Sequence, residues 1–540
     1  MHETTDFRDK MAISRAIADY RRGRISRRTM LKTLAAAGVA LSAGPMRGPR
    51  AWAAPARQEL TADQQPEEIN AWLTDVGSQF SGASIKVVSE ETPPSRAIIN
   101  LKAALFEELT GITVNWEVVP LDQVLAKVSQ DAAAQLGAND IYYFDQAWVG
   151  RFINDTFDPR ELLETKPDLA MPDYNIDDFL EPLVLHIATY GDKMIGFPCD
   201  VPIFMYFYRQ DIYDEMGLEP ATTMEEYLSN AQAINEAMSA DGTYGTVGQM
   251  KSGHYSLETD MTAYVWSHGG SVFTADGICS LNDEWAVTGV DYMRELQQYM
   301  PAAVTTYDWG GQFTAIQQGQ GGQVITWGED FPGWDDPANS QVSGLMQPAP
   351  LPANTAQRPP EEAGFEEVPD LGHQGGSTYC LSAYSKQADP AWIFLQWATS
   401  SNTQTLASVI GGGASPMRQS TFDDPRVKAE EEVGAGTTRH FPQMLEVINA
   451  RMGTEPHLPQ WPLIATDIIA VAKSEGGDAG VQVAFWRGGR LLGSEFFPMQ
   501  ARVEDPAGEI LAGFIGQFYA EAAVVPRSLL LGSDLPDGEA

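Results

Sequence analysis

The sequence predicts an α/β protein with a mostly parallel sheet, and three observations support this class. From about residue 84 onward, apolar runs of strand length alternate with segments of helical apolar spacing. The turns between them are short, as expected for parallel strands joined by crossover helices. The 540 residues are 43% apolar and 10% aromatic, which is typical of a globular protein with a large core.

The alternation is clearest between residues 84 and 145. Strands are expected over 84–89, 112–119 and 140–145, where apolar side chains alternate or run continuously between turn residues. Helices are expected between them, over 95–109 and 121–135. Further along, the pattern predicts a strand over 203–208, helices over 225–238, 258–268 and 284–299, another strand over 378–383 and a helix over 390–400.

Polar residues follow two of these strands where ligands bind in open α/β sheets, beyond the carboxyl ends. They are Glu90-Glu91-Thr92 after the first strand and Asp145-Gln146 after the third. These side chains are therefore candidates for ligand contact. The alternative is that they cap helices and form turns, as Asp and Thr often do.

The first 53 residues have the layout of an export signal. Arg27 and Arg28 precede a short apolar run over 34–41 and an Ala-x-Ala pattern that ends at Ala53. This order resembles a twin-arginine signal, and it implies a periplasmic mature protein that is exported already folded. The alternative is a basic amphipathic helix of the mature protein. No later apolar run approaches the length of about 20 residues that a membrane span needs.

The chain is strongly acidic, with 35 basic and 73 acidic residues and a net charge of −38. The signal segment holds 11 of the basic and 4 of the acidic residues, so the mature chain carries 24 against 69. Such a protein repels phosphate backbones and anionic lipids, and we expect no nucleic-acid partner. The excess of acid indicates solubility and does not identify a ligand.

Sequence signatures of catalysis and metal binding are absent. The chain has no HExxH, GxSxG, GxxxxGK[ST] or CxxC pattern, and its seven histidines do not pair at metal-ligand spacing. We therefore expect no metal, no cofactor and no catalytic residue. The cysteines Cys199, Cys279 and Cys380 could form one disulfide or remain three buried thiols.

Tryptophans lie beside glycines and acids at several places, including Trp266, Trp327 and Trp334. Aromatic faces cover the C–H faces of a carbohydrate, and carboxylates accept hydrogen bonds from its hydroxyls. Each tryptophan taken singly is more often a core residue. Several of them near glycine turns favour at least one stacking platform.

Three stretches, in this order and spacing, resemble the sugar-type extracellular solute-binding proteins of ABC importers. The first starts at Phe197-Pro198-Cys199-Asp200 and continues to residue 220, the second covers 319–327, and the third extends from Gly375-Gly376 to Arg418. They are similar to the segments that cross between the two lobes of that family. The likeness covers about 84–430 and fades beyond about 475.

The resemblance implies a two-lobed periplasmic-binding-protein fold of the type II kind, in which each lobe is a mostly parallel sheet flanked by helices. The ligand cleft would lie between lobes that close by a hinge. It implies a monomer that binds a sugar or polyol without catalysis and delivers it to the transmembrane subunits of an ABC permease. The expected organisation is a signal (1–53), an N-terminal arm (54–83), lobe one (84–200 and 323–376), lobe two (201–322 and 377–475) and a C-terminal extension of unknown role (476–540).

Mapping by position gives the expected cleft residues. Carboxylates would accept from solute hydroxyls, tryptophans would stack on the solute, and an arginine would donate to hydroxyls or a carboxylate; the candidates are Glu91, Asp145, Asp200, Trp266, Trp327, Trp334, Gly376 and Arg418. An exported carbohydrate-active enzyme with an Asp/Glu pair is the alternative from another class. A ligand sensor that signals to a receptor is a third reading.

Overall fold

The computed structural model describes residues 60–251, 254–273, 280–353, 358, 370–410, 412–434 and 436–455, and the backbone of three further strands up to residue 500. The expected signal, with Arg27, Arg28 and Ala53, lies outside the described residues, and so does Cys279. Over the described residues, no helix has both the length and the apolarity needed to cross a membrane.

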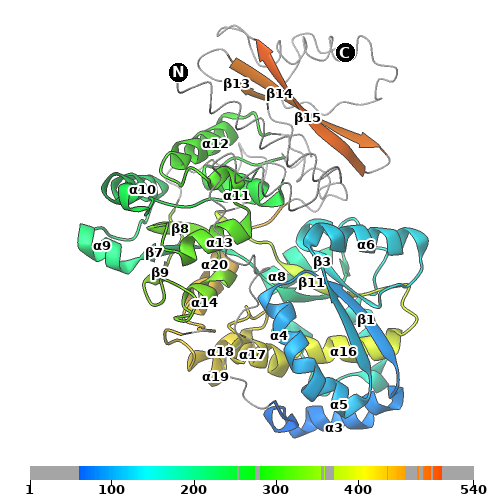
Figure 1. Ribbon diagram of the computed structural model, residues 1–540. Helices are drawn as coiled ribbons and strands as arrows, with labels where there is room; N and C mark the ends of the chain where they lie inside the picture. Colours follow the sequence, from blue (N-terminus) through cyan, green and yellow to red (C-terminus); the bar gives the residue numbers. More distant parts are fainter. Residues whose placement is uncertain are drawn as a thin grey trace, which may run out of the picture. The chain divides into compact units, whose positions relative to one another are not determined.

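The first sheet has five strands in the order β2-β1-β3-β11-β6 (Figure 1). The strands β1 (Ser84–Ser89), β2 (Thr113–Val118) and β3 (Ile141–Asp145) are parallel to one another, which confirms the α/β class with a mostly parallel sheet. Strand β11 (Ser377–Leu381) lies antiparallel between β3 and β6 (Phe197–Asp200). A segment far along the chain therefore completes the middle of this sheet.

Both faces of the first sheet are covered, because its strands are apolar on both sides. Tyr142 and Phe144 pack on the face covered by α6 (Leu121–Ala134), and Tyr143 packs on the face covered by α4 (Pro93–Lys102) and α16 (Ala388–Ala398). Successive strand residues point to opposite faces, so one continuous apolar run serves two cores.

The helix expected over 95–109 begins earlier and is interrupted. Thr92 caps α4 by accepting a hydrogen bond from the Ser95 backbone N–H at 3.3 Å. A π-helical turn (Ala103–Glu107) joins α4 to the short α5 (Glu108–Thr110), and Gly111 ends it in the left-handed conformation at φ 70°.

The second sheet is antiparallel, with β7 (Phe204–Arg209) between β8 (Gln323–Trp327) and β9 (Met346–Ala349). The expectation of a mostly parallel sheet in each lobe is therefore wrong for this sheet, because its neighbouring strands run in opposite directions. Its helices include α10 (Met224–Met238), which starts with a capping box between Thr223 and Glu226. The other helices of this part are α9 (Gln210–Met216), α11 (Tyr255–Ser267), α12 (Glu284–Gln297), α13 (Trp309–Gln317) and α14 (Phe331–Trp334).

The strand pairing corrects the expected lobe boundaries. The segment 323–376 was expected with the first sheet, but its strand β8 pairs with β7 of the second sheet. The segment 377–475 was expected with the second sheet, but its strand β11 pairs with β3 and β6 of the first. Strands β8 and β11 are thus exchanged relative to the expectation, and the chain returns to the first sheet between β9 and β11.

The expected N-terminal arm is part of the core from residue 60 onward. Helix α3 (Glu67–Asp75) buries Ile69, Trp72 and Leu73. The buried Gln65 side chain accepts a hydrogen bond from Trp397 Nε1 at 2.7 Å. The segment is polar on average, but α3 has one apolar face, and that face is buried.

Short elements complete the described residues. Strands β10 (Gly372–His373) and β12 (Met452–Gly453) pair in parallel and bring His373 close to the residues after β12. The remaining elements are α7 (Pro159–Thr165), α8 (Glu181–Ile187), α17 (Ser401–Val409), α18 (Gln419–Asp423), α19 (Pro425–Lys428), α20 (Phe441–Ala450), β4 (Thr189–Tyr190), β5 (Lys193–Met194), and the antiparallel sheet of β13 (Val471–Lys473), β14 (Asp478–Arg487) and β15 (Arg490–Gln500).

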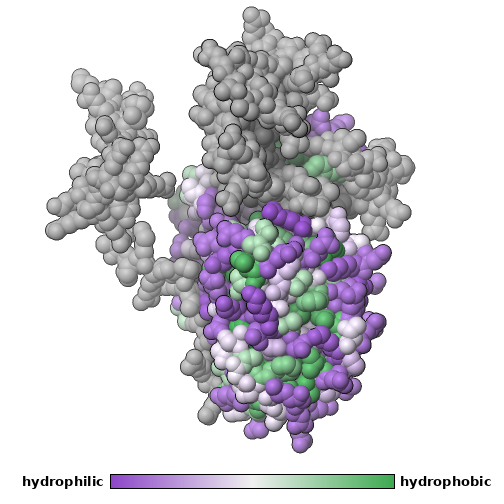
Figure 2. Space-filling view, turned by 90° about the vertical axis from the view of Figure 1, so that its right-hand side faces the viewer, coloured by the Kyte–Doolittle hydropathy of each residue, from purple (hydrophilic) through white to green (hydrophobic). Residues whose placement is uncertain are grey.

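Hydrophilic residues dominate the face of the molecule seen in Figure 2, where smaller groups of hydrophobic residues lie among them. The large apolar side chains that are most exposed come from separate elements, for example Leu136, Leu185 and Val433. This surface fits a chain with a net charge of −38.

Candidate functional site

Buried carboxyl groups lie together at one edge of the first sheet. Asp145 ends β3 and Asp200 ends β6, and both side chains are almost fully buried. Because β11 is antiparallel, its first residue Ser377 lies at the same edge, in register with Asp145 on one side and Asp200 on the other. The edge is the carboxyl end of the parallel strands, where α/β sheets bind ligands.

Asp200 is linked to the second sheet's side of the molecule. Its Oδ2 accepts a hydrogen bond from Tyr143 Oη at 3.1 Å, and it also hydrogen-bonds to Glu329. Glu329 lies in the turn after β8, so the two carboxyls come from the ends of strands in different sheets. Burial and then the charge of Asp200 raise the pKa of Glu329 well above its ordinary value, so Glu329 keeps a proton to a higher pH than an exposed glutamate does.

The expected residue Glu91 is replaced at the site by its neighbour Glu90. Glu91 is exposed and pairs with Arg96 on the surface. Removal from water, followed by the charges of Asp200 and Asp122, raises the pKa of Glu90 to about 8. The two side chains differ in this way because neighbouring residues of an extended chain point in opposite directions, and a ligand contact of Glu91 stays a prediction.

Asp145 has the capping role considered for it, and its contact with a ligand stays a prediction. Its Oδ1 accepts the Ala147 backbone N–H at 2.8 Å and so caps the short helical turn that follows β3. Burial, and then the charge of Glu455, raise the pKa of Asp145 well above its ordinary value.

Two of the three expected tryptophans come together around His373. The Trp266 ring stacks on the His373 ring at 5.1 Å with an interplanar angle of 20°, and Trp327 meets the same ring edge-on at 5.8 Å. Trp327 Nε1 donates to Gln249 Oε1 at 3.1 Å, which fixes the plane of its ring. The aromatic faces are thus carried by β8 and α11, beside the carboxyls of the first sheet.

Trp334 and Arg418 are buried in contacts with the protein itself and do not fit the ligand roles expected for them, whereas the expected role of Gly376 stays a prediction. Trp334 is fully buried among rings of the second sheet, at 5.4 Å from the Phe207 ring. Gly376 allows close packing, because an added Cβ would lie 2.1 Å from Ile187 Cδ1.

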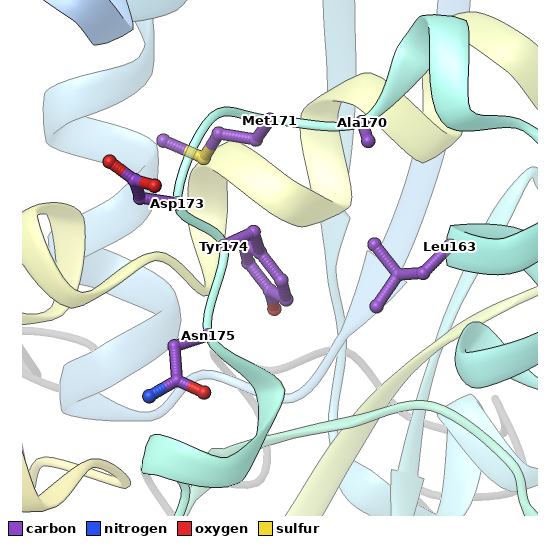
Figure 3. Close-up of a pocket in the computed structure, with 6 residues that line it drawn as sticks. All are labelled: Leu163, Ala170, Met171, Asp173, Tyr174 and Asn175. Atoms are coloured by element: carbon purple, nitrogen blue, oxygen red, sulfur yellow. The ribbon is translucent and has the colours of Figure 1, made fainter.

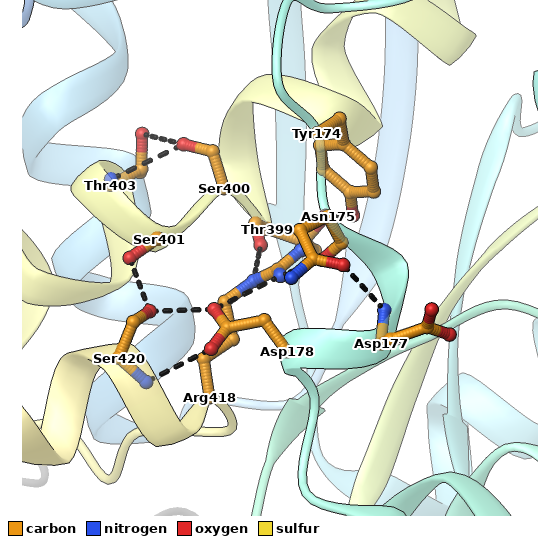
Figure 4. A network of polar contacts seen from close by, with 10 residues as sticks. All are labelled: Tyr174, Asn175, Asp177, Asp178, Thr399, Ser400, Ser401, Thr403, Arg418 and Ser420. Atoms are coloured by element: carbon orange, nitrogen blue, oxygen red, sulfur yellow. Dashed lines mark hydrogen bonds and ion pairs between the residues drawn. The ribbon is translucent and has the colours of Figure 1, made fainter.

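Arg418 connects the segment around Asn175 to the end of α16 at Thr399 (Figure 4). Its Nε donates to the Thr399 carbonyl at 2.7 Å, its Nη1 donates to the Asn175 carbonyl at 2.5 Å, and its guanidinium covers the Phe179 ring at 3.7 Å. Asp178 completes the network at 3.4 Å. Arg418 is 1% exposed and is held by these protein contacts, so it is a core residue.

A depression of about 500 Å³ lies next to this network, between Leu163 and the 170–175 segment (Figure 3). Tyr174 and Leu163 line it, and Tyr174 is also 4.9 Å from the Arg418 guanidinium. The lining is largely apolar and contains none of the buried carboxyls described above, so it is not the site that the sheet edge forms.

Cys199 and Cys380 are buried free thiols on neighbouring strands of the first sheet. For these two residues the structure supports the buried-thiol alternative. Burial raises the pKa of both thiols well above the ordinary value, which keeps them unreactive.

The sequence missed three residues of this region: Glu90, Glu329 and Gln249. Glu329 follows Trp327 directly in Trp-Gly-Glu-Asp, so the acid after the strand was a usable signal. Gln249 had none, because it lies in an irregular segment between α10 and α11.

The family model described as "Bacterial extracellular solute-binding protein" matches residues 89–405. The match covers more than half of the chain and includes the strands of both sheets except for most of β1. The chain therefore belongs to the family of bacterial extracellular solute-binding proteins, a class of transporter components and not of enzymes.

Particular relatives agree with this class. The chain is 22% identical over 352 residues to a probable amino-acid ABC transporter periplasmic-binding protein of Sinorhizobium fredii, covering 64% of this chain and 75% of that protein. It is 23% identical over 425 residues to an erythritol/L-threitol-binding protein of Mycolicibacterium smegmatis, covering 74% and 82%. An ABC transporter solute-binding protein of Agrobacterium radiobacter in complex with ribitol superposes with a TM-score of 0.62 at 24% identity, covering 72% and 92%.

The C-terminal segment is similar to a different family. A model of the UvrC ribonuclease H-like domain matches residues 465–540. The UvrABC system protein C of Symbiobacterium thermophilum is 43% identical over 77 residues, which is 14% of this chain and 12% of that protein. The segment therefore corresponds to a small part of a protein of another kind, and its activity does not transfer to this chain.

Proposed function

We propose that this protein is the extracytoplasmic receptor of an ABC importer and binds a sugar or polyol. The observation that carries the proposal is the edge of buried carboxyls on the first sheet, opposite aromatic faces carried by the second sheet's elements. Asp200 and Glu90 supply acceptors for hydroxyl groups, and Trp327 supplies a face for C–H groups. Relatives named for erythritol and ribitol support the polyol class.

In this proposal, each sheet is the centre of one lobe. The first lobe holds β1, β2, β3, β6 and β11, and the second holds β7, β8 and β9. A solute that contacts both lobes favours the closed form, because those contacts exist only when the lobes meet. The monomeric closed form would then deliver the solute to the transmembrane permease subunits. The twin-arginine segment would export the chain to the periplasm.

A thermal-shift screen of the mature protein tests the assignment. We expect erythritol, ribitol, mannitol or maltose to raise the melting temperature, since a ligand at about a hundred times its Kd stabilises the folded state by about 2.7 kcal/mol. Asp200→Asn should weaken the binding of that solute by about tenfold or more, because a charged acceptor is lost. Glu91→Gln is the matched control, since Glu91 is exposed and paired with Arg96.

A rise in melting temperature with an amino acid, and none with any sugar or polyol, would contradict the solute class. It would leave membership in the solute-binding family intact. Equal solute affinity in Asp200→Asn and Glu91→Gln would contradict the location of the site.

A further inference from the structure

Three buried side chains that are distant in sequence converge beside the solute site. Glu258 comes from α11, His373 from β10, and Glu455 from the residues after β12. One donor atom from each lies within 4.8 Å of the others. We name these three residues the His373 cluster.

The direct contacts within the His373 cluster are short. His373 Nε2 lies 3.0 Å from Glu455 Oε1, and Glu455 Oε2 accepts from Tyr255 Oη at 2.6 Å and from Gln146 Nε2 at 2.8 Å. Glu455 thus has its own partners on both oxygens. The imidazole plane is fixed by stacking on Trp266.

Glu258 presents the unexplained atom. One carboxylate oxygen accepts from Thr262, and the other, Oε2, is buried without a hydrogen-bond donor among the described residues. The group that faces Glu258 is the carboxylate of Glu455. Two buried carboxylates that face each other repel unless a cation or a proton lies between them.

We propose that the His373 cluster binds one divalent transition-metal cation, with zinc or manganese as the ions of matching chemistry. Two carboxylates and one imidazole are a donor set that these ions take. A separation of 3.0 Å between His373 Nε2 and Glu455 Oε1 suits two ligands of the same ion. Tyr255 and Gln146 are positioning residues, because they hold the carboxylate of Glu455 from behind.

The bound cation would join α11, β10 and the segment after β12. Its place beside Trp266 and Trp327 makes it a neighbour of the proposed solute site. Histidine spacing could not predict it, since each ligand comes from a different part of the chain. The proposal does not depend on which solute the protein binds.

Metal titration of the full mature chain tests the proposal. After treatment with EDTA and dialysis, Zn²⁺ or Mn²⁺ should raise the melting temperature, and mass spectrometry of the metal content should find about one ion per chain. Co²⁺ used as a spectroscopic probe should give visible absorption bands of nitrogen and oxygen coordination in the unmodified protein. This second readout does not require a variant to fold.

Matched variants locate the ion. Glu258→Gln and His373→Gln should lose the bound ion, and Tyr255→Phe should weaken binding by about tenfold. The controls are Glu284→Gln and His186→Gln, which change an exposed acid and an exposed histidine of other helices. The proposal is overturned if the wild-type protein holds no ion under saturating Zn²⁺ and Mn²⁺, or if His373→Gln and His186→Gln bind equally.

A shared proton between Glu258 and Glu455 is the competing arrangement, and it predicts no metal uptake at all. A solute-induced rise in melting temperature that persists in EDTA, together with no metal uptake, would reject the ion and retain the proposed function.

Discussion

Buried carboxyl groups determine the electrostatics of the first sheet's edge. Burial raises the pKa of Asp145, Asp200 and Glu329, so each of these groups keeps its proton to a higher pH than an exposed acid does. A protonated carboxyl donates one hydrogen bond and still accepts others. Such a group can therefore donate to the oxygen of a solute hydroxyl or accept from its hydrogen.

Glu90 makes this effect measurable. Its pKa in the folded protein is about 8, above the ordinary value of 4.5, so the folded state retains a proton that the unfolded chain loses as the pH rises. The contribution of Glu90 to stability is therefore present below pH 4.5 and is lost as the pH rises toward 8. Glu90→Gln should flatten this decline by about 1–2 kcal/mol, the full shift being reduced by solvent access.

Urea unfolding at pH 5 and pH 8 measures this difference for wild type, Glu90→Gln and the control Glu91→Gln. The control changes the next residue along the chain, whose side chain is exposed and ion-paired with Arg96. Identical pH dependence in the two variants would disprove the role of Glu90.

At the scale of elements, the start of β11 is the tightest junction of the first sheet. Gly376 precedes the strand, its carbonyl accepts the Gln146 backbone N–H at 2.9 Å, and its Cα faces Ile187 at the end of α8. The absence of a side chain lets α8 approach the strand that lies between β3 and β6. The junction thereby fixes the register that aligns Ser377 with Asp145 and Asp200.

Gly376→Ala should lower the free energy of unfolding by about 1–3 kcal/mol, because the new methyl group would displace buried Ile187. Gly434→Ala is the control, since an added Cβ there meets nothing within 4 Å. Denaturant midpoints of the two variants provide the measurement. A stability of Gly376→Ala equal to that of the control would refute the packing argument.

Local pattern was sufficient for the elements themselves, as β1 and α10 illustrate, because alternation and capping residues act over a few positions. It was insufficient for β11, whose place depends on pairing with β6 and with β3, which lie far earlier in the chain. The same distance dependence explains Arg418 and Trp334. Their types suit a ligand site, and only the packed structure reveals that carbonyls and rings already surround them.

At the scale of the whole molecule, the chain combines a part that matches the solute-binding family with a C-terminal segment that matches a UvrC domain. The family match ends at residue 405, and the described residues of the proposed solute and ion sites end at Glu455. The UvrC-like match begins at 465. The two likenesses therefore do not overlap in sequence, which makes them separable by truncation.

A chain ending at residue 464 should keep the solute-induced rise in melting temperature, because every residue of the proposed site precedes the cut. A chain ending at residue 450 is the control and should be less stable, since it lacks β12, which pairs with β10, and Glu455, which contacts His373. Calorimetry of both truncations with the identified solute measures this. Loss of binding in the longer truncation would assign the tail a part in recognition.

The position of β11 has a consequence for biosynthesis. Strands β3 and β6 emerge from the ribosome well before residue 377, and the edges that later flank β11 remain unpaired in that interval. Unpaired strand edges are templates for pairing with other chains. The nascent chain therefore passes through a period of aggregation risk that ends only when residue 381 is available, and a chaperone that shields strand edges would act in that interval.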